Sequence, residues 1–327
     1  MSGAQTVRFG QAIGKALADA MRADPRVILL GEDIGEAGGP FGVTRGLWAE
    51  FGGERVRDFP ISEAALVGTA LGAALSGYKT VAEIMFMDFV TLAMDALVNQ
   101  AAKAHFMFGG RASVPLVVRA PHGGGVNAGA QHSQCLEAWF AHVPGLQVVC
   151  PATPADAYGL LRTAVDSPNP VVFVENKSLY ARKGELADDQ GPIPFGKARL
   201  ARSGRDVTVV TYGASVYHAE TAAGRLATQG IEVEIVDLRS LQPWDEAAVL
   251  ASLSRTHRLV VFHEAVEAFG IGAEIAARMA DIGFDELDAP IVRVGAPFMP
   301  VAYAPRLEAA YTPDADKLEA AIRRVLG

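Results

Sequence analysis

Apolar residues in the first half of the chain form short continuous runs separated by longer segments with helical spacing. The runs are rich in Val, Ile and Leu, which is typical of parallel strands covered on both faces. They lie at residues 26–33, 80–86, 114–121, 146–152 and 170–176. Helices are predicted between them at 62–78, 88–105 and 154–165. Strand followed by helix, repeated, predicts an α/β doubly wound sheet.

The pattern pauses at residues 180–206, a stretch rich in charge, Gly and Pro that we interpret as a linker. The alternation then resumes. Further strands are predicted within 206–213, 231–245, 258–265 and 290–297, with helices from Ser215, up to Ser254, from Gly270 and from Asp314. We therefore expect two domains, residues 1–190 and 191–327.

Composition narrows the class of protein. Half of the 327 residues are apolar, 20% are charged, and the formal net charge is −8. No Lys/Arg cluster favours nucleic acid or an anionic membrane as a partner. The two cysteines form no metal or disulfide framework, the N-terminus lacks a signal-peptide core, and the longest apolar stretch, 64–75, is short for a membrane span. We expect a soluble cytoplasmic protein.

Several catalytic motifs are incomplete. "HGGG" at 122–125 resembles an esterase oxyanion loop, but the chain has no G-x-S-x-G. "HEAVE" at 263–267 has Glu where a zinc protease needs its second His, and there is no G-x-x-x-x-G-K-[ST]. "GIGAEI" at 270–275 begins like a dinucleotide fingerprint, with Ile275 in place of the third glycine. An NAD-binding dehydrogenase subunit remains an alternative on that motif.

The segment "RDFPISEAALVGTALGAALSGY", residues 57–78, carries one carboxylate at the start of its predicted helix, Glu63. A cap from Ser62 and a favourable interaction with the helix dipole would explain it structurally. Two features favour a functional role instead. The helix is rich in small residues, which let a backbone or a flat ligand approach closely. Glu63 also lies just beyond a strand end, where open α/β sheets bind ligands.

Longer stretches carry a family resemblance: "FPISEAALVGTALGAALSGYKTVAEIMFMDF", "PHGGGVNAGAQHSQCLEAWFAHVPGLQVVCPATPADAYGLL" and "NPVVFVENKSLY". With them the chain resembles the β subunit of the thiamine-diphosphate-dependent decarboxylase component of 2-oxoacid dehydrogenase complexes, the pyruvate, branched-chain and acetoin types. The resemblance implies a transketolase-like fold, with a pyrimidine-binding domain followed by a transketolase C-terminal domain. It also implies oxidative decarboxylation of a 2-oxo acid, or cleavage of acetoin, with acyl transfer to a lipoyl carrier.

The resemblance assigns roles to individual residues. Glu63 would hydrogen-bond the aminopyrimidine ring of thiamine diphosphate and so activate the cofactor. Phe89 would stack on that ring, and Ile61 would line the same pocket through its backbone. His132, in "AQHSQ", would help transfer the acyl group to the lipoyl carrier. His122 is interpreted as loop architecture or substrate-pocket lining.

Two metal ions are expected, Mg²⁺ on a partner subunit and K⁺ on this chain. Thiamine-diphosphate enzymes of this kind hold Mg²⁺ through a G-D-G…N motif, which the chain lacks. A separate α subunit is therefore expected to hold Mg²⁺, in an α2β2 assembly that works with a lipoyl-bearing transacylase. A loop that binds K⁺ in some relatives matches this chain at Ala164, Val165, Ser167 and Asn169. Relatives often have Asp at position 167.

Two further interpretations stay open beside the preferred one. The chain could belong to a specialised thiamine-diphosphate enzyme that passes the activated aldehyde to a non-lipoyl acceptor. It could also be a non-catalytic scaffold subunit. The presence of Glu63, Phe89 and His132 argues against that interpretation. The sequence leaves open which 2-oxo acid, or acetoin, is the substrate.

Overall fold

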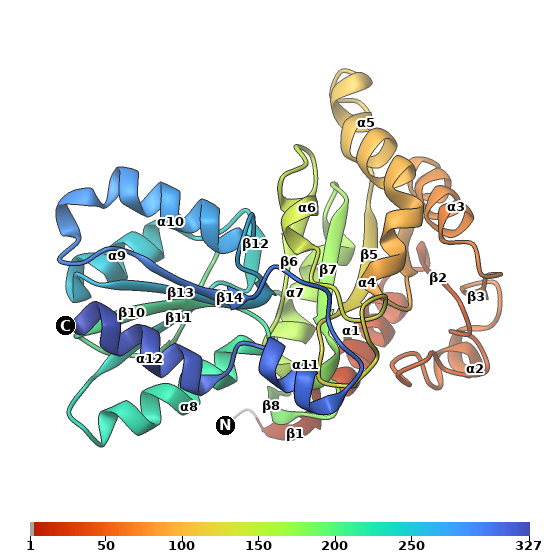
Figure 1. Ribbon diagram of the computed structural model, residues 1–327. Coiled ribbons are helices and arrows are strands. Elements are labelled where there is room, and N and C mark those ends of the chain that lie inside the picture. The colour runs from red at the N-terminus through yellow and green to blue at the C-terminus, as the bar shows by residue number, and fades with distance from the viewer. Residues whose placement is uncertain (1–2) are drawn as a thin grey trace. The chain divides into compact units, whose positions relative to one another are not determined.

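Two sheets organise the protein, whose computed structural model describes residues 3–327 (Figure 1). The chain divides into two compact units. The first contains the residues up to His122 together with Trp139–Phe195. The second contains Gly123–Ala138 and Gly196–Gly327. A short segment from the middle of the chain therefore clusters with the C-terminal unit.

The first unit is built on parallel strands in the order β6-β7-β5-β4-β2-β3. Its strands, with the antiparallel pair β1 and β8, are β1 (Ala4–Arg8), β2 (Val27–Gly31), β3 (Val56–Asp58), β4 (Lys79–Glu83), β5 (Leu116–His122), β6 (Gln147–Val149), β7 (Val171–Asn176) and β8 (Lys183–Ala187). Its helices are α1 (Phe9–Ala23), α2 (Leu47–Phe51), α3 (Glu63–Leu75), α4 (Met87–Val90), η1 (Thr91–Ala93), η2 (Asp95–Ala101), α5 (Ala102–Met107), α7 (Pro154–Asp166) and η3 (Lys177–Leu179). Helix α6 (Glu137–Ala141) begins in the segment that clusters with the second unit.

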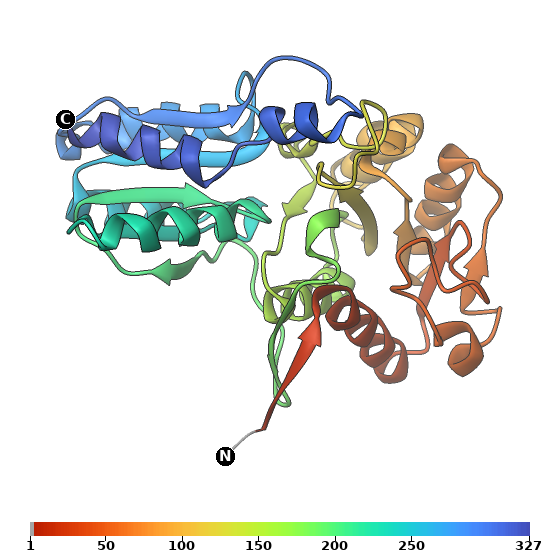
Figure 2. The same cartoon turned by 60° about the horizontal axis from the view of Figure 1, so that its bottom comes forward.

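The continuous apolar runs become buried central strands, as predicted. Every residue of β2, β5 and β7 is buried. Helices α1 and α7 pack together on one face of the sheet, and α3 packs against β2, β4 and β5 (Figure 2). Helix α7 begins where its sequence directs, since Pro154 is its first residue and the Thr153 hydroxyl accepts a hydrogen bond from the Asp156 N–H at 3.1 Å.

The second unit has a five-stranded sheet in the order β14-β13-β10-β11-β9, in which β9 alone is antiparallel to its neighbour. Its elements are β9 (Arg199–Arg202), β10 (Val207–Thr211), α8 (Ser215–Ala227), β11 (Val233–Asp237), β12 (Ser240–Gln242), α9 (Glu246–Thr256), β13 (Leu259–Val266), α10 (Ile271–Ile282), η4 (Phe284–Glu286), β14 (Val292–Ala296), α11 (Pro305–Tyr311) and α12 (Ala315–Leu326). Helices α8 and α12 cover one face of this sheet, and α9 and α10 cover the other (Figure 1). The predicted α/β architecture is confirmed.

Two predicted segments differ from the structure. The helix expected at 88–105 is divided into α4, η1, η2 and α5. One physical reason is local: the Thr91 hydroxyl donates to the Asp88 carbonyl at 2.7 Å and competes with the regular helical ladder. The predicted linker 180–206 also contains strands β8 and β9, which pair with β1 and β11, partners distant in the sequence.

Within residues 3–327, no helix combines the length and the apolar character that crossing a bilayer requires.

Candidate active site

The first sheet has a topological switch point between β2 and β4. From β2 the chain moves to β3 on one side, and from β4 it moves to β5 on the other. Loops that leave neighbouring parallel strands in opposite directions open a crevice at the carboxyl ends of those strands, where open α/β sheets bind ligands. Glu32 directly follows β2, and residues 84–86 lead from β4 into α4.

Glu63 is the first residue of α3, and only 6% of its surface is exposed. Ser62 stands at the N-cap position, but its side chain makes no capping hydrogen bond, so the proposed Ser62 cap is wrong. Within residues 3–327, no group donates a hydrogen bond to the Glu63 carboxyl. Neither Glu63 oxygen is among the fully buried atoms that lack a partner, so the carboxyl keeps accessible surface through which a ligand could reach it.

Glu32 is a second buried carboxylate beside Glu63, and the sequence interpretation missed it. It is 4% exposed, and its Oε1 atom has no hydrogen-bond partner among the described residues. Burial raises the pKa of Glu32, the charge of Glu63 raises it further, and a backbone hydrogen bond from Ser62 lowers it. The signal was present in the sequence, because Glu32 follows a buried strand just as Glu63 follows β3.

Ile61 and Phe89 frame the same edge of the sheet. Ile61 lies in the bend before α3, with 84% of its surface exposed. Phe89 lies in α4, is half-buried, and packs edge-to-face against Phe86 with ring centroids 5.9 Å apart. The first unit thus carries Glu63, Glu32, Ile61 and Phe89 on the segments that follow β2, β3 and β4.

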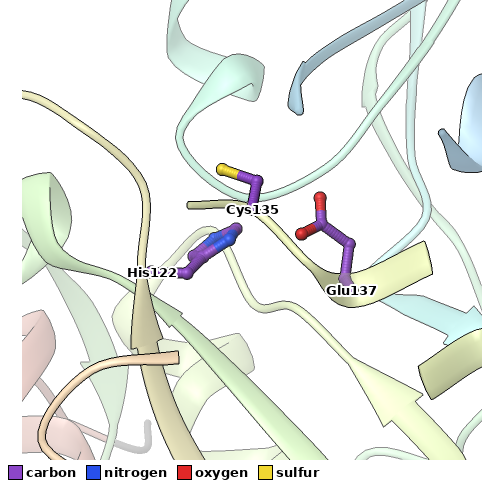
Figure 3. A group of neighbouring side chains, drawn as sticks. All are labelled: His122, Cys135 and Glu137. Carbon is purple, nitrogen blue, oxygen red and sulfur yellow. The ribbon is translucent and has the colours of Figure 1, made fainter. Parts of the chain in front are cut away.

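His132 belongs to the Gly-rich segment Gly123–Ala138, which clusters with the second unit. The residue is half-buried, and its backbone N–H donates to the Gly129 carbonyl at 3.3 Å. The far end of the segment is anchored by Glu137, which is fully buried and accepts a 2.8 Å hydrogen bond from the Tyr212 hydroxyl. Figure 3 shows the side chains of Glu137 and its neighbour Cys135.

His122 differs from its predicted place. It is the last residue of β5 and is 2% exposed, so it belongs to the sheet and not to the loop. Its Nε2 atom lies 3.9 Å from the sulfur of Cys150, which is also buried. His122 therefore ends a strand and does not shape the loop, and its interpretation as substrate-pocket lining stays a prediction.

The predicted K⁺ loop lies at the end of α7. The Ser167 hydroxyl lies 2.8 Å from Gln147 Oε1 and 3.0 Å from the Asn169 carbonyl, and it accepts from the Asn169 N–H at 3.1 Å. The Ala164 carbonyl accepts from the Ser167 N–H at 3.2 Å. A cavity of about 380 Å³ lined by Ser167 and Asn169 adjoins these oxygens.

The "GIGAEI" glycines have a packing explanation. A Cβ atom on Gly272 would lie 2.6 Å from Nε2 of His263, a fully buried ring that stacks on Tyr212. The Gly272 N–H donates to that Nε2 at 3.3 Å, and His263 Nδ1 lies 3.2 Å from the Ala265 carbonyl. Both contacts fit a neutral ring protonated at Nδ1, and burial lowers the pKa of His263. The glycines bring the start of α10 close to β13.

Comparison with known proteins matches both units to domain families. Residues 5–183 match the transketolase pyrimidine-binding domain, and residues 196–318 match the transketolase C-terminal domain. A solved structure titled "Split gene transketolase, inactive beta4 tetramer" superposes with a TM-score of 0.82, covering 98% of each chain at 24% identity. That likeness supports the fold.

Curated relatives are similar over almost the whole chain. The β subunit of acetoin:2,6-dichlorophenolindophenol oxidoreductase from Bacillus subtilis is 46% identical, over 99% of this chain and 98% of the relative. The subunit of the same name from Cupriavidus necator is 47% identical, over 96% of each. The pyruvate dehydrogenase E1 component subunit beta-2 of Oryza sativa is 43% identical, over 98% of this chain and 85% of the relative.

Proposed function

We propose that this chain, which belongs to the transketolase-like β subunits of the decarboxylase component of 2-oxoacid dehydrogenase complexes, takes part in the oxidative decarboxylation of a 2-oxo acid or the cleavage of acetoin. The observation that carries the proposal is Glu63, a residue only 6% exposed at the switch point of the sheet, whose carboxyl receives no hydrogen bond from the described chain. A ligand nitrogen is the partner that this carboxyl needs.

Thiamine diphosphate fits this edge of the sheet. When bound, it supplies a thiazolium carbon that attacks the substrate carbonyl. Glu63 would share a proton with the aminopyrimidine ring nitrogen, and burial keeps water from competing for that hydrogen bond. The half-buried ring of Phe89 offers a stacking surface, and the backbone of Ile61 would line the pocket. Glu32, whose pKa is raised, would add a second proton-holding group beside Glu63.

His132 would act on the acyl group as it passes to a lipoyl carrier. An imidazole titrates near neutral pH, so it can give a proton to a dithiolane sulfur. The Gly-rich segment that carries His132 provides a backbone of defined shape around it.

An α subunit would complete the site and hold Mg²⁺, because this chain has no G-D-G motif. Several exposed positions of the first unit suit such a partner. Cβ atoms added to Gly68 and Gly72 of α3 would meet nothing within 4 Å, so that face of the helix is open. Leu92 is 61% exposed and Phe106 is 87% exposed. Large exposed apolar side chains mark interaction surfaces. An α2β2 assembly served by a lipoyl-bearing transacylase follows as the proposed complex.

We keep the C-terminal end of α7 and the residues that follow it as a proposed K⁺ site. The carbonyls of Ala164, Val165 and Asn169, with the Ser167 hydroxyl, offer the oxygen ligands that K⁺ takes. The cavity of about 380 Å³ beside them gives access. A cytoplasmic location also stays a prediction.

The test of cofactor activation uses Glu63→Gln in the assembled α/β complex. The variant keeps the size of the side chain, so assembly and cofactor binding should persist. Hydrogen–deuterium exchange at the thiazolium carbon of bound cofactor should slow by about 10²–10⁴-fold, the usual contribution of a positioned acid or base. Glu274→Gln, at an exposed position on α10, is the matched control. Exchange at the wild-type rate in Glu63→Gln would refute the assigned role.

The two-subunit requirement has its own test. Titration calorimetry of thiamine diphosphate and Mg²⁺ should give weak binding to the purified chain alone and tight binding once an α subunit is present. Tight Mg²⁺-dependent binding by this chain alone would contradict the proposal.

A further inference from the structure

The backbone of the His132 segment has an unusual conformation at its start. The backbone angle φ is positive, between 55° and 87°, at Gly123, Gly125, Asn127 and Gly129. It is not positive at the residues between them. Alternation of this kind turns successive backbone N–H groups toward one side, which creates a concavity that favours an anion. The segment Gly123–Gly129 therefore presents donors that need a negatively charged acceptor.

Two carboxylates of the second unit supply that acceptor. Glu308 Oε1 accepts from the Gly125 N–H at 3.1 Å, and Glu308 Oε2 accepts from the Asn127 N–H at 3.1 Å. Glu264 Oε1 accepts from the Gly124 N–H at 2.6 Å. Both oxygens of Glu308 thus accept from this loop, and Glu264 accepts from Gly124 in the same loop.

Glu308 has no other charged partner to explain its burial. It lies on α11, is 4% exposed, and makes no ion pair within the part of the chain that the structure describes. A buried carboxylate is stabilised when backbone N–H groups donate to it. The N–H groups of Gly125 and Asn127 fill that role for Glu308.

Gly129 connects the C-terminal residue Tyr303 to His132. A Cβ atom on Gly129 would lie 2.4–2.6 Å from ring carbons of Tyr303, so the ring and the loop backbone meet only because this residue is glycine. The Gly129 carbonyl accepts the backbone N–H of His132. Tyr303 and Glu308 come from the same C-terminal stretch, which therefore contacts the loop on both sides of Asn127.

We propose that Glu308, assisted by Glu264, is a positioning residue for His132. Its carboxylate occupies the anion-binding concavity of the loop and fixes the backbone from which the imidazole projects. The inference rests on the proposed function for what His132 does. The clamp itself concerns the second unit alone.

Hydrogen exchange tests the clamp directly. In peptides covering residues 123–129, Glu308→Ala should speed amide exchange by about tenfold or more, since the charged acceptor of the Gly125 and Asn127 N–H groups is lost. Glu308→Gln keeps one acceptor oxygen and places an amide N–H₂ toward the Asn127 N–H, so it should give an intermediate rate. Glu274→Gln, at an exposed position on α10, should leave these peptides unchanged. Unchanged exchange in Glu308→Ala would overturn the clamp.

A double-mutant cycle tests positioning in the assembled complex. Glu308→Ala alone should lower acyl transfer to a lipoyl domain by about tenfold, with a smaller change in decarboxylation measured with a dye acceptor. Because the residue acts through His132, Glu308→Ala should add nothing in a His132→Ala background. Additive losses, or equal losses in both assays, would mean a general structural role and would overturn the proposal.

The two hypotheses fail in different ways. If the complex turned over neither 2-oxo acids nor acetoin, the proposed function would fall, and the exchange experiment would still decide whether Glu308 holds the loop. If Glu63→Gln behaved as expected while the Glu308 variants left exchange unchanged, only the clamp would fall.

Discussion

Two pairs of buried carboxylates lie at the carboxyl ends of strands in the same sheet, and the chain compensates them differently. Glu83 ends β4 and Glu175 lies near the end of β7, and both are almost fully buried. Glu32 follows β2 and Glu63 begins α3. The first pair shares a cation from the strand between them, and the second pair has no cation from the described chain.

Arg119 on β5 holds the first pair. Its Nε and Nη2 atoms donate to the two oxygens of Glu175 at 2.6 and 2.8 Å, and its Nη1 donates to Glu83. The Tyr180 hydroxyl donates to Glu175 at 2.6 Å. Burial alone would lower the pKa of Arg119, but the charges of Glu175 and Glu83 outweigh it and raise that pKa. Burial holds the pKa of Glu83 above its usual range although the charge of Arg119 lowers it, so this one cation serves two carboxylates.

The two pairs differ in whether the chain itself supplies a cation to the buried carboxylates. Neutralising groups from the same chain indicate that a buried charge serves the fold. Glu32 has one oxygen without a partner among the described residues, and the Glu63 carboxyl receives no donor from them, so this pair is open to a donor from a ligand. We therefore expect the ligand site at the second pair and a structural role for Arg119.

The largest effect on stability is expected from Arg119→Met. Removing the cation leaves two buried carboxylates uncompensated, so the free energy of unfolding should fall by about 3–5 kcal/mol. Urea denaturation measures it. Arg225→Met is the matched control, because Arg225 pairs with Asp316 at the surface and such pairs contribute about 0–1 kcal/mol. Equal losses in the two variants would contradict the comparison.

Tyr180→Phe should have a smaller effect in the same network. It removes one donor to Glu175 while Arg119 still binds both oxygens, so the loss should be about 1 kcal/mol, at the low end for a buried acceptor. Tyr78→Phe, at an exposed position with no side-chain hydrogen bond among the described residues, should change stability by less than about 0.5 kcal/mol. A loss in Tyr180→Phe no greater than in Tyr78→Phe would remove Tyr180 from the network.

Glu63→Gln should change the stability of the chain by less than about 1 kcal/mol. It loses a favourable interaction with the start of α3, of about 0.3–1 kcal/mol, and it relieves repulsion from Glu32. The same substitution is expected to slow cofactor activation greatly. Thermal denaturation beside the activity assay checks this contrast, and a large stability loss would place Glu63 with the structural pair.

Glu32→Gln should alter the pH dependence of stability. The folded-state pKa of Glu32 is raised above its ordinary value of 4.5, so the folded state holds that proton more tightly than the unfolded state. Stability from this group is present below 4.5 and is lost as pH rises through the folded-state pKa. The variant lacks that loss, so its stability relative to wild type should increase with pH. Parallel profiles, from urea titrations at about pH 4 and pH 8, would contradict the assignment.

Much of the fold followed from local pattern. Buried parallel strands need continuous apolar runs, and these runs located β2, β4, β5 and β7 within a few residues. Strands β8 and β9 escaped prediction, because their apolar content is low and their stability depends on pairing with β1 and β11. The position of Glu63 at a strand end was also visible in the sequence.

The sequence by itself determined that the chain alternates strand and helix, that Glu63 starts a helix beyond a strand, and that the chain resembles a particular family of β subunits. Only the tertiary structure decided which buried carboxylates share Arg119 and which C-terminal side chains contact the loop that precedes His132. The spacing of apolar positions along the sequence indicates which residues face the core, and this spacing depends only on residues close together in the chain. Compensation of Glu175 by Arg119, and of the Gly125 N–H by Glu308, joins residues far apart in the chain, so only the folded backbone can bring them together.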